Sequence, residues 1–251
     1  MAEMTKPKFP GEVVDLPSGG LIYPENSPLH SGKLEIKYMT AREEDILTSQ
    51  NLIKKGVVID KLLDSLILTE GIKSNDLLIG DKNAIMVAVR ILAYGPEYTV
   101  DIVDPNSDDK IKHTFNLADC PFKKLPEDVD YSVNEFDLEL PVSKINIKFK
   151  LLTGKDETQM EQELKASSKI GSSTEITTRL KHLITSVDGE TKKAEINKFV
   201  NDMLSRDSFA LRQEVLRISP DIMLTQEIEI GGELVEVDIP LTVNFFWPET
   251  I

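Results

Sequence analysis

The sequence predicts an α+β fold with a helical core, two or more antiparallel β-hairpins and an extended N-terminal arm. Three observations support this fold class. Apolar residues recur at the 3.6-residue spacing of amphipathic helices in several segments. In other segments apolar and polar residues alternate around polar turns, as they do in hairpins. Helical and strand patterns do not alternate along the chain, so the sequence predicts no series of βαβ units.

Residues 1–33 are predicted to form the extended arm. Proline and glycine occur too often in this segment for a helix or a central strand. Apolar residues recur between them, whereas disordered tails are usually poorer in such residues. We therefore expect most of the arm to lie on a protein surface, either of this chain or of a partner. The arm residues that we predict to contact a partner are Leu16, Leu21, Ile22 and Tyr23.

Residues 34–165 are predicted to form an N-terminal α+β domain. A strand over 33–39 is followed by Thr40 and Glu43, which have the spacing of a capping box and predict the start of a helix. Two further helices follow, and Gly95 with Pro96 ends the second of them. The expected elements after the first helix are helices over about 57–67 and 81–93, a hairpin over 98–117, strands within 136–152, and a helix from Thr153 to about residue 169.

Residues 174–251 are predicted to form three helices and a terminal hairpin, after a linker over 166–174. The first helix is expected to reach Val187, and the hairpin is expected to turn at Gly231 and Gly232. Strict alternation predicts that the last strand extends from Val235 to Phe245. Phe246 would then lie on the outer face as a partner-binding residue, unless a helix covers both faces and makes it a core residue.

Charge and cysteine content exclude several classes of function. Lys and Arg total 29 against 43 Asp and Glu, which gives a formal net charge of −14. Such a surface repels phosphate backbones and anionic headgroups, so we expect no nucleic-acid partner. A single cysteine, Cys120, excludes an internal disulfide and a cysteine-cluster metal site. The most apolar stretch, 84–94, contains Arg90 and is about half the length of a bilayer helix, so no transmembrane segment is expected.

No group of residues in the sequence predicts catalysis or cofactor binding. Gly154 and Lys155 lack the other residues of a phosphate-binding loop. The three histidines are far apart, and Cys120 has no spaced partners that would mark a nucleophile. The calcium-like spacing that begins at Asp104 lacks the central glycine and the final glutamate. We therefore expect no enzyme, no metal site, no cofactor and no small-molecule substrate.

Three segments resemble proteins of contractile-tailed bacteriophages. They are LPSGGLIYPE (16–25), KLEIKYMTAREEDILTSQNLIKKGVVIDKLLDSLI (33–67) and IPLTVNFFWPE (239–249), with a looser likeness in FKLLTGKDE (149–157). These segments are similar to the T-even-type baseplate hub family, whose members are hub subunits or hub assembly proteins. The second segment is long and specific, whereas FFWP alone would be a weak signal.

The resemblance implies a structural or morphogenetic role in the tail baseplate, without catalysis. The implied partners are other phage baseplate or hub proteins. The implied location is the host cytoplasm during assembly and the virion tail baseplate afterwards. An alternative from a different class is a transient, chaperone-like assembly factor of the hub that is absent from the mature particle. A cell-wall hydrolase is a third possibility that no set of residues supports.

Overall fold

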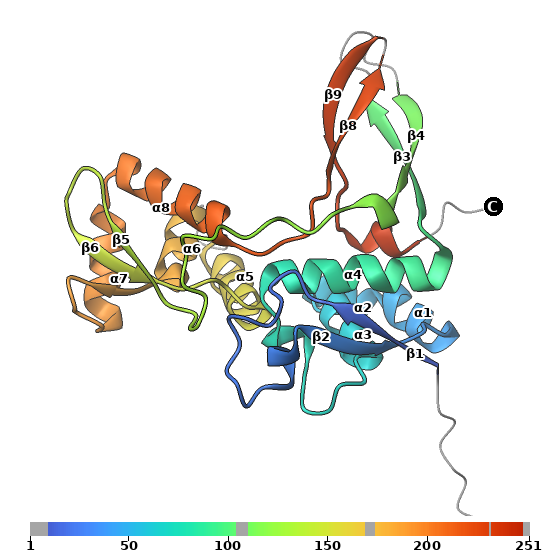
Figure 1. Cartoon of the computed structure of the whole chain (residues 1–251), viewed down its shortest axis with the longest axis horizontal. Helices are drawn as coiled ribbons and strands as arrows, with labels where there is room; N and C mark the ends of the chain where they lie inside the picture. Colours follow the sequence, from blue (N-terminus) through green and yellow to red (C-terminus); the bar gives the residue numbers. More distant parts are fainter. Residues whose placement is uncertain (1–9, 104–109, 169–173, 231, 248–251) are drawn as a thin grey trace, which may run out of the picture.

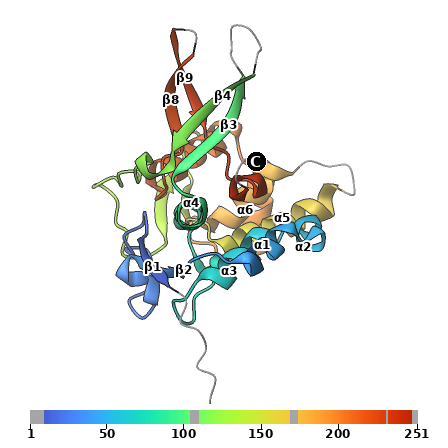
Figure 2. The ribbon, with the colours of Figure 1, turned by 90° about the vertical axis from the view of Figure 1, so that its right-hand side faces the viewer.

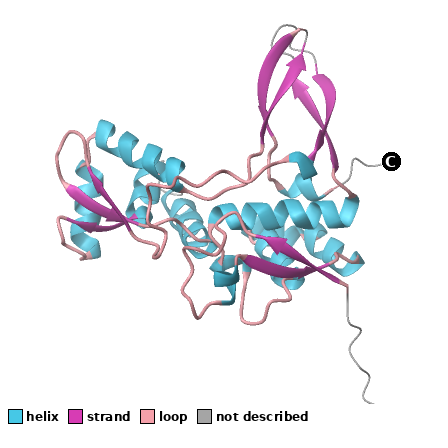
Figure 3. Cartoon of the chain, viewed as in Figure 1, coloured by secondary structure: helices cyan, strands magenta, loops and turns pink. Residues whose placement is uncertain are grey.

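The computed structural model describes residues 10–103, 110–168, 174–230 and 232–247. Within these residues it confirms the α+β class, with helices and several small antiparallel sheets (Figure 3). Three predicted features lie largely outside the described residues: the linker at 169–173, the turn of the first hairpin at 104–109, and the turn of the terminal hairpin at Gly231.

The order of the elements follows the predicted pattern in most of the chain. The first half contains β1 (Gly11–Asp15), β2 (Lys33–Lys37), α1 (Ala41–Thr48), α2 (Gln50–Lys55), α3 (Val58–Leu66), α4 (Ile79–Tyr94), β3 (Glu97–Val103) and β4 (Lys110–Asn116). The second half contains β5 (Phe136–Glu139), β6 (Asn146–Phe149), α5 (Gly154–Ser168), α6 (Glu175–Leu183), β7 (Ile184–Val187), α7 (Lys193–Asp202), α8 (Ser205–Ile218), β8 (Thr225–Ile230), β9 (Glu233–Asp238) and the short 3₁₀ helix η4 (Val243–Phe246).

Helix α4 lies at the centre of the molecule. The β1–β2 ribbon and helices α1 to α3 lie on one side of α4 (Figures 1 and 2). The sheet β5–β6–β7 with α6, α7 and α8 lies beyond the start of α4, at the left end of the molecule in Figure 1. The hairpins β3–β4 and β8–β9 project together from the remaining side of α4 (Figure 1). Because α4 is apolar on nearly all its faces, it can bury surface against several of these groups at once.

The registers of the hairpins explain the apolar alternation in the sequence. In the first hairpin Tyr98 lies opposite Phe115 and Ile102 lies opposite Ile111. These apolar residues pair across the two strands because successive side chains of a strand point to opposite faces.

The middle sheet has the order β5–β6–β7, so it combines strands from both sides of the expected linker. The division into two domains at this linker stays a prediction.

Two predicted elements, the helix expected to reach Val187 and the strand expected to reach Phe245, are shorter in the structure than the sequence predicted. Residues Ile184 to Val187, expected at the end of a helix, form strand β7, where Ile184 and Ser186 are buried and alternate with less buried neighbours. Three of these four residues are β-branched, which favours a strand. The last strand ends at Asp238 rather than Phe245, because its partner strand begins at Thr225, opposite Asp238. Pro240 then offers no amide for a ladder.

Candidate protein-interaction site

The N-terminal arm is attached to the beginning of α4 by a buried carboxylate. Asp81, in the first turn of α4, accepts hydrogen bonds from the Ser18 amide at 2.9 Å, the Ser18 hydroxyl at 2.7 Å and the Tyr23 hydroxyl at 2.6 Å. The Tyr23 oxygen in turn accepts from the Leu78 amide at 2.8 Å. Burial raises the pKa of Asp81 despite these hydrogen bonds. These buried hydrogen bonds make the arm part of the core.

Three of the four arm residues predicted to contact a partner are core residues of this chain. Leu16, Ile22 and Tyr23 are 3%, 4% and 7% exposed, so in this structure they pack within the chain's own core, and their contact with a partner stays a prediction. The arm folds back because Gly20 has a positive φ of 81°, and an added Cβ would overlap the carbonyl of His30. Leu21, at 53% exposed, is the one predicted arm residue that faces outward.

Phe246 is a core residue as well, which corrects the predicted division of faces. Phe245 and Phe246 are both fully buried, and their rings meet edge to face at 5.4 Å between centroids. Phe245 also packs against Tyr98 at 5.0 Å. The two side chains do not alternate as they would in a strand, because residues 243–246 form η4, whose tighter turn lets adjacent side chains both point into the core. Phe246 is therefore a packing residue in the described chain.

A buried arginine holds the C-terminal segment and the first hairpin to α4. Arg90 donates from Nε to the Phe245 carbonyl at 3.1 Å, from Nη1 to the Gly95 carbonyl at 3.1 Å and from Nη2 to the Glu97 carbonyl at 3.3 Å. Its guanidinium lies over the ring of Tyr94 at 5.1 Å. The planar guanidinium thus connects α4, the start of β3 and η4 through hydrogen bonds from a single side chain.

The two hairpins form a projection, defined here as β3, β4, β8 and β9. Ile102, Ile228 and Ile230 are buried, whereas Leu234 on β9 is 74% exposed. Each strand of the projection pairs only with its hairpin partner within the described residues. At the base, the Met223 amide donates to the Pro121 carbonyl at 2.8 Å, which holds the two connecting segments together. The sequence predicted each hairpin but contained no signal that the two would lie side by side.

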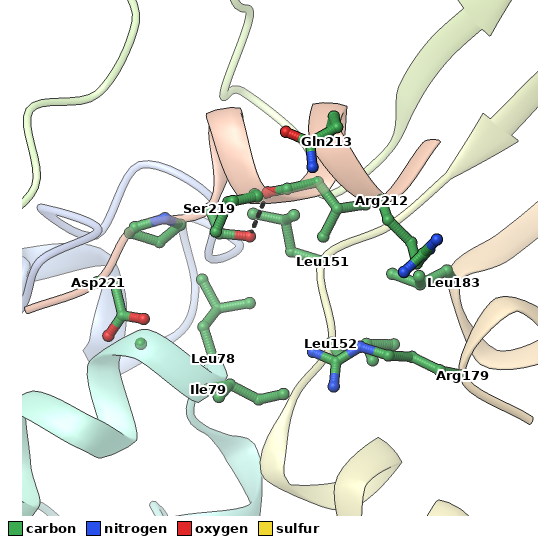
Figure 4. Close-up of a pocket in the computed structure, with 14 residues that line it drawn as sticks. Leu78, Ile79, Leu151, Leu152, Arg179, Leu183, Arg212, Gln213, Ser219 and Asp221 are labelled. Atoms are coloured by element: carbon green, nitrogen blue, oxygen red, sulfur yellow. Dashed lines mark hydrogen bonds between the residues drawn. The ribbon is translucent and has the colours of Figure 1, made fainter. Parts of the chain in front are cut away.

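A cleft of about 360 Å³ lies between the start of α4, residues 151–152, α6 and α8 (Figure 4). Its apolar lining includes Leu78, Leu152 and Leu183, which are core side chains. Two arginines, Arg179 from α6 and Arg212 from α8, line the end away from Asp221 (Figure 4). The sequence contains no signal for this cleft, because its walls come from four separate segments of the chain.

Neither a metal centre nor a membrane span is found in the part of the chain that the structure describes. No group of three or more His, Cys, Asp or Glu residues there has an arrangement that could hold a metal ion. None of the helices described is long and apolar enough to cross a bilayer. The candidate sites are therefore the hairpin projection and the arginine-lined cleft.

The fold and these surfaces define an α+β protein built from small antiparallel sheets, with a projecting hairpin pair as its most prominent feature. Residues 13–247 match the family model described as T4 bacteriophage base plate protein. The chain therefore belongs to this family, which confirms the resemblance at the level of a T4-type baseplate protein. Searches of curated proteins and of solved structures gave no match.

Proposed function

We propose that this chain is a structural or morphogenetic component of the baseplate hub of a contractile tail. It acts by protein–protein contacts and without catalysis, and its partners are other baseplate or hub proteins. Assembly takes place in the host cytoplasm, and the chain then stays in the virion tail. The observation that carries the proposal is the projection of two paired hairpins on a baseplate-family chain.

The projection has the features of a contact surface for another protein. Two-stranded hairpins leave a free edge on each strand, and such edges pair readily with a strand from another chain. Leu234, 74% exposed on β9, adds an apolar side chain that has no core function in this chain. Arg90 fixes the base of the projection to α4, so a contact made there would be transmitted to the body of the molecule.

The buried carboxylates support a role without catalysis, because each one holds a loop or a helix end. Glu43 bonds to the Thr40 amide at 3.0 Å, Asp156 to the Thr153 amide at 3.0 Å, and Asp207 to the Val142 amide at 2.8 Å. In each of the three, burial raises the pKa, but hydrogen bonds outweigh it and leave the pKa below its ordinary value. Groups of this kind serve as helix caps and loop anchors.

Mass spectrometry of purified tails and of isolated baseplate intermediates tests this proposal. We expect the chain in both samples at a fixed ratio to other baseplate proteins. Presence in the intermediates and absence from mature tails would instead identify the transient assembly factor. Absence from both would overturn the proposed function altogether.

A substitution on the projection gives a second test of the proposal. In a host that supplies the chain to a phage lacking its gene, Leu234→Asp is expected to reduce the yield of infectious particles at least about tenfold. The thermal midpoint of the purified chain should not change, because the side chain is exposed. The matched control is Val133→Asp, at a loop residue that is 59% exposed and lies outside the projection, and it should change neither quantity.

A further inference from the structure

The arginine-lined cleft combines a buried apolar floor with an exposed, partly cationic rim. Its floor consists of Leu78, Leu152 and Leu183, each 5% exposed or less. Leu216, 66% exposed, continues the apolar surface from the floor onto the outside of α8. Phe209 lies two turns before Leu216 on the same face of α8, and the guanidinium of Arg212 contacts its ring at 5.8 Å.

The two cleft arginines carry charge that no side chain among the described residues neutralises. Among the described residues, neither Arg179 nor Arg212 forms an ion pair or a hydrogen bond with another side chain. The carboxylate of the cleft, Asp221, accepts instead from the Asn83 amide group at 3.1 Å and from the Ile222 amide at 2.9 Å. Although the chain has a net charge of −14, this cleft therefore places two positive charges, without a charge partner among the described residues, beside an apolar floor.

The cleft is fixed in place by a close contact between its two sides. A Cβ added to Gly80, at the start of α4, would overlap the carbonyl of Pro220, which follows α8. Lys123 also donates to the Ser219 carbonyl at 3.1 Å, at the end of α8. The start of α4 and the end of α8 are therefore packed directly against each other at one side of the cleft, so this side is formed before any partner arrives, which lowers the entropic cost of binding.

We propose that this cleft binds a segment of a neighbouring baseplate protein that carries an acidic side chain next to apolar ones. The carboxylate of that segment pairs with Arg179 and Arg212, and its apolar side chains cover the leucine floor and Leu216. This inference names the chemistry of one partner and therefore rests on the proposed function. Guanidinium groups recognise carboxylates through paired hydrogen bonds, and a pocket of this volume takes a few side chains rather than a whole helix.

Charge favours a partner of a different sequence over a second copy of this chain. Two copies of net charge −14 repel each other as they approach, and two arginines on each copy offset little of this repulsion. A different protein can present an acidic segment on a neutral or basic surface. Association of two copies through the cleft is therefore an outcome that would overturn the proposal.

Site-specific photo-cross-linking in infected cells tests the proposal on the full chain. Gln213 lines the cleft and is exposed, so it is replaced by p-benzoylphenylalanine, and the cross-linked segment is identified by mass spectrometry. A second chain carries the same probe at Leu234, on the projection, as a positional control. We expect the Gln213 probe to label a baseplate protein within a segment that contains Asp or Glu beside apolar residues.

Charge reversal shows whether the arginines make the contact. Arg179→Glu and Arg212→Glu should each reduce the yield of the Gln213 cross-link about tenfold or more, because like charges replace a charge-assisted pair. Arg42→Glu, an equal change of charge on α1, should leave the yield unchanged. Replacing the partner's acidic residue by Lys should restore the cross-link to the Arg212→Glu chain.

Several results would overturn the proposal. They are a cross-link to a second copy of this chain, a labelled segment without a carboxylate, a yield insensitive to both charge reversals, or labelling of the baseplate from Leu234 but not from Gln213. The last result would leave the proposed function intact. Failure of both probes to label any baseplate protein would instead count against the proposed function itself.

Discussion

At the scale of single residues, buried carboxylates connect segments that are far apart in the sequence. Asp207 on α8 accepts from the amides of Val142 and Ser143, which lie in the turn between β5 and β6. Asp81 on α4 accepts from the arm. The pKa of Asp81 is raised because burial dominates, whereas hydrogen bonds to the backbone outweigh burial at Asp207 and lower its pKa. Both aspartates hold a distant segment, but the pKa of Asp81 is raised and the pKa of Asp207 is lowered.

Removal of the Tyr23 hydroxyl is predicted to destabilise the chain. Tyr23→Phe leaves Asp81 without its 2.6 Å donor and the Leu78 amide without its acceptor, both in a buried environment. We expect a loss of about 2–3 kcal/mol in the free energy of unfolding, measured by denaturant titration. The matched control is Tyr38→Phe, whose hydroxyl donates to Glu12 at the surface, so its removal should leave the free energy of unfolding nearly unchanged. Equal losses in the two variants would contradict a special role for the Asp81 network.

The start of α1 predicts a pH-dependent effect of Thr40→Ala. Glu43 is buried and accepts from the Thr40 hydroxyl at 2.5 Å, the Thr40 amide at 3.0 Å and the Lys37 ammonium at 2.8 Å. Burial raises its pKa, but these hydrogen bonds outweigh burial and lower it. A lowered folded pKa adds stability above the unfolded value of about 4.3, and this stability is lost as pH falls through the folded pKa.

Thr40→Ala is therefore expected to cost about 1–2 kcal/mol at pH 7, and less in acid. Unfolding by urea at pH 7 and below pH 4 measures the difference. Thr48→Ala is the control on the same helix, since its hydroxyl donates only to the carbonyls of Glu44 and Asp45 at the surface. A cost that is the same at both pH values would show that Glu43 does not gain its charge stabilisation from Thr40.

At the scale of elements, the spacing of apolar residues predicted the helices and hairpins that depend only on their own stretch of sequence. The helix from about residue 81, the hairpin over 98–117 and the three helices after the expected linker all form, because their apolar spacing selects one face. The paired strand β1 was not predicted, since its partner β2 lies beyond the turns of the arm. The cleft and the projection could not be predicted, because both bring together segments separated by more than a hundred residues, such as Gly80 and Pro220.

The joint at Arg90 predicts that the arginine cannot be replaced by lysine. Arg90→Lys keeps the charge but reaches fewer of the three carbonyls of Phe245, Gly95 and Glu97 from one ammonium group. We expect a loss of about 3 kcal/mol in unfolding free energy and faster amide hydrogen exchange over residues 239–247. Arg42→Lys, at an exposed position on α1, should change neither measurement. Exchange that stays slow over 239–247 in Arg90→Lys would contradict the proposed joint.

At the scale of the whole molecule, α4 is the element to which the other groups attach. Its start binds the arm through Asp81, and its end binds β3 and η4 through Arg90. In its first half, the ammonium of Lys82 lies 2.9 Å from Asp60 on α3 and 2.9 Å from Glu157 on α5. Burial lowers the pKa of Lys82, but the two carboxylates outweigh it and raise the pKa. Polar contacts along one helix therefore orient three groups of elements.

This arrangement predicts that the arm is required for folding, whereas the sequence predicted a surface segment whose apolar residues contact a partner. Deletion of residues 1–30 removes β1 from its pairing with β2 and takes Ser18 and Tyr23 away from the buried Asp81. It also uncovers core surface that Leu16 and Ile22 fill. An uncompensated buried carboxylate and an open core each cost several kcal/mol, comparable to the stability of a typical domain. Circular dichroism and a thermal melt of the truncated chain should show no cooperative transition.

Leu21→Asp is the control that changes the surface of the arm without removing its packing. This side chain is 53% exposed, so the substitution should leave the thermal midpoint of the chain unchanged. A truncated chain that melts cooperatively near the full-length midpoint would show that α4 does not depend on the arm.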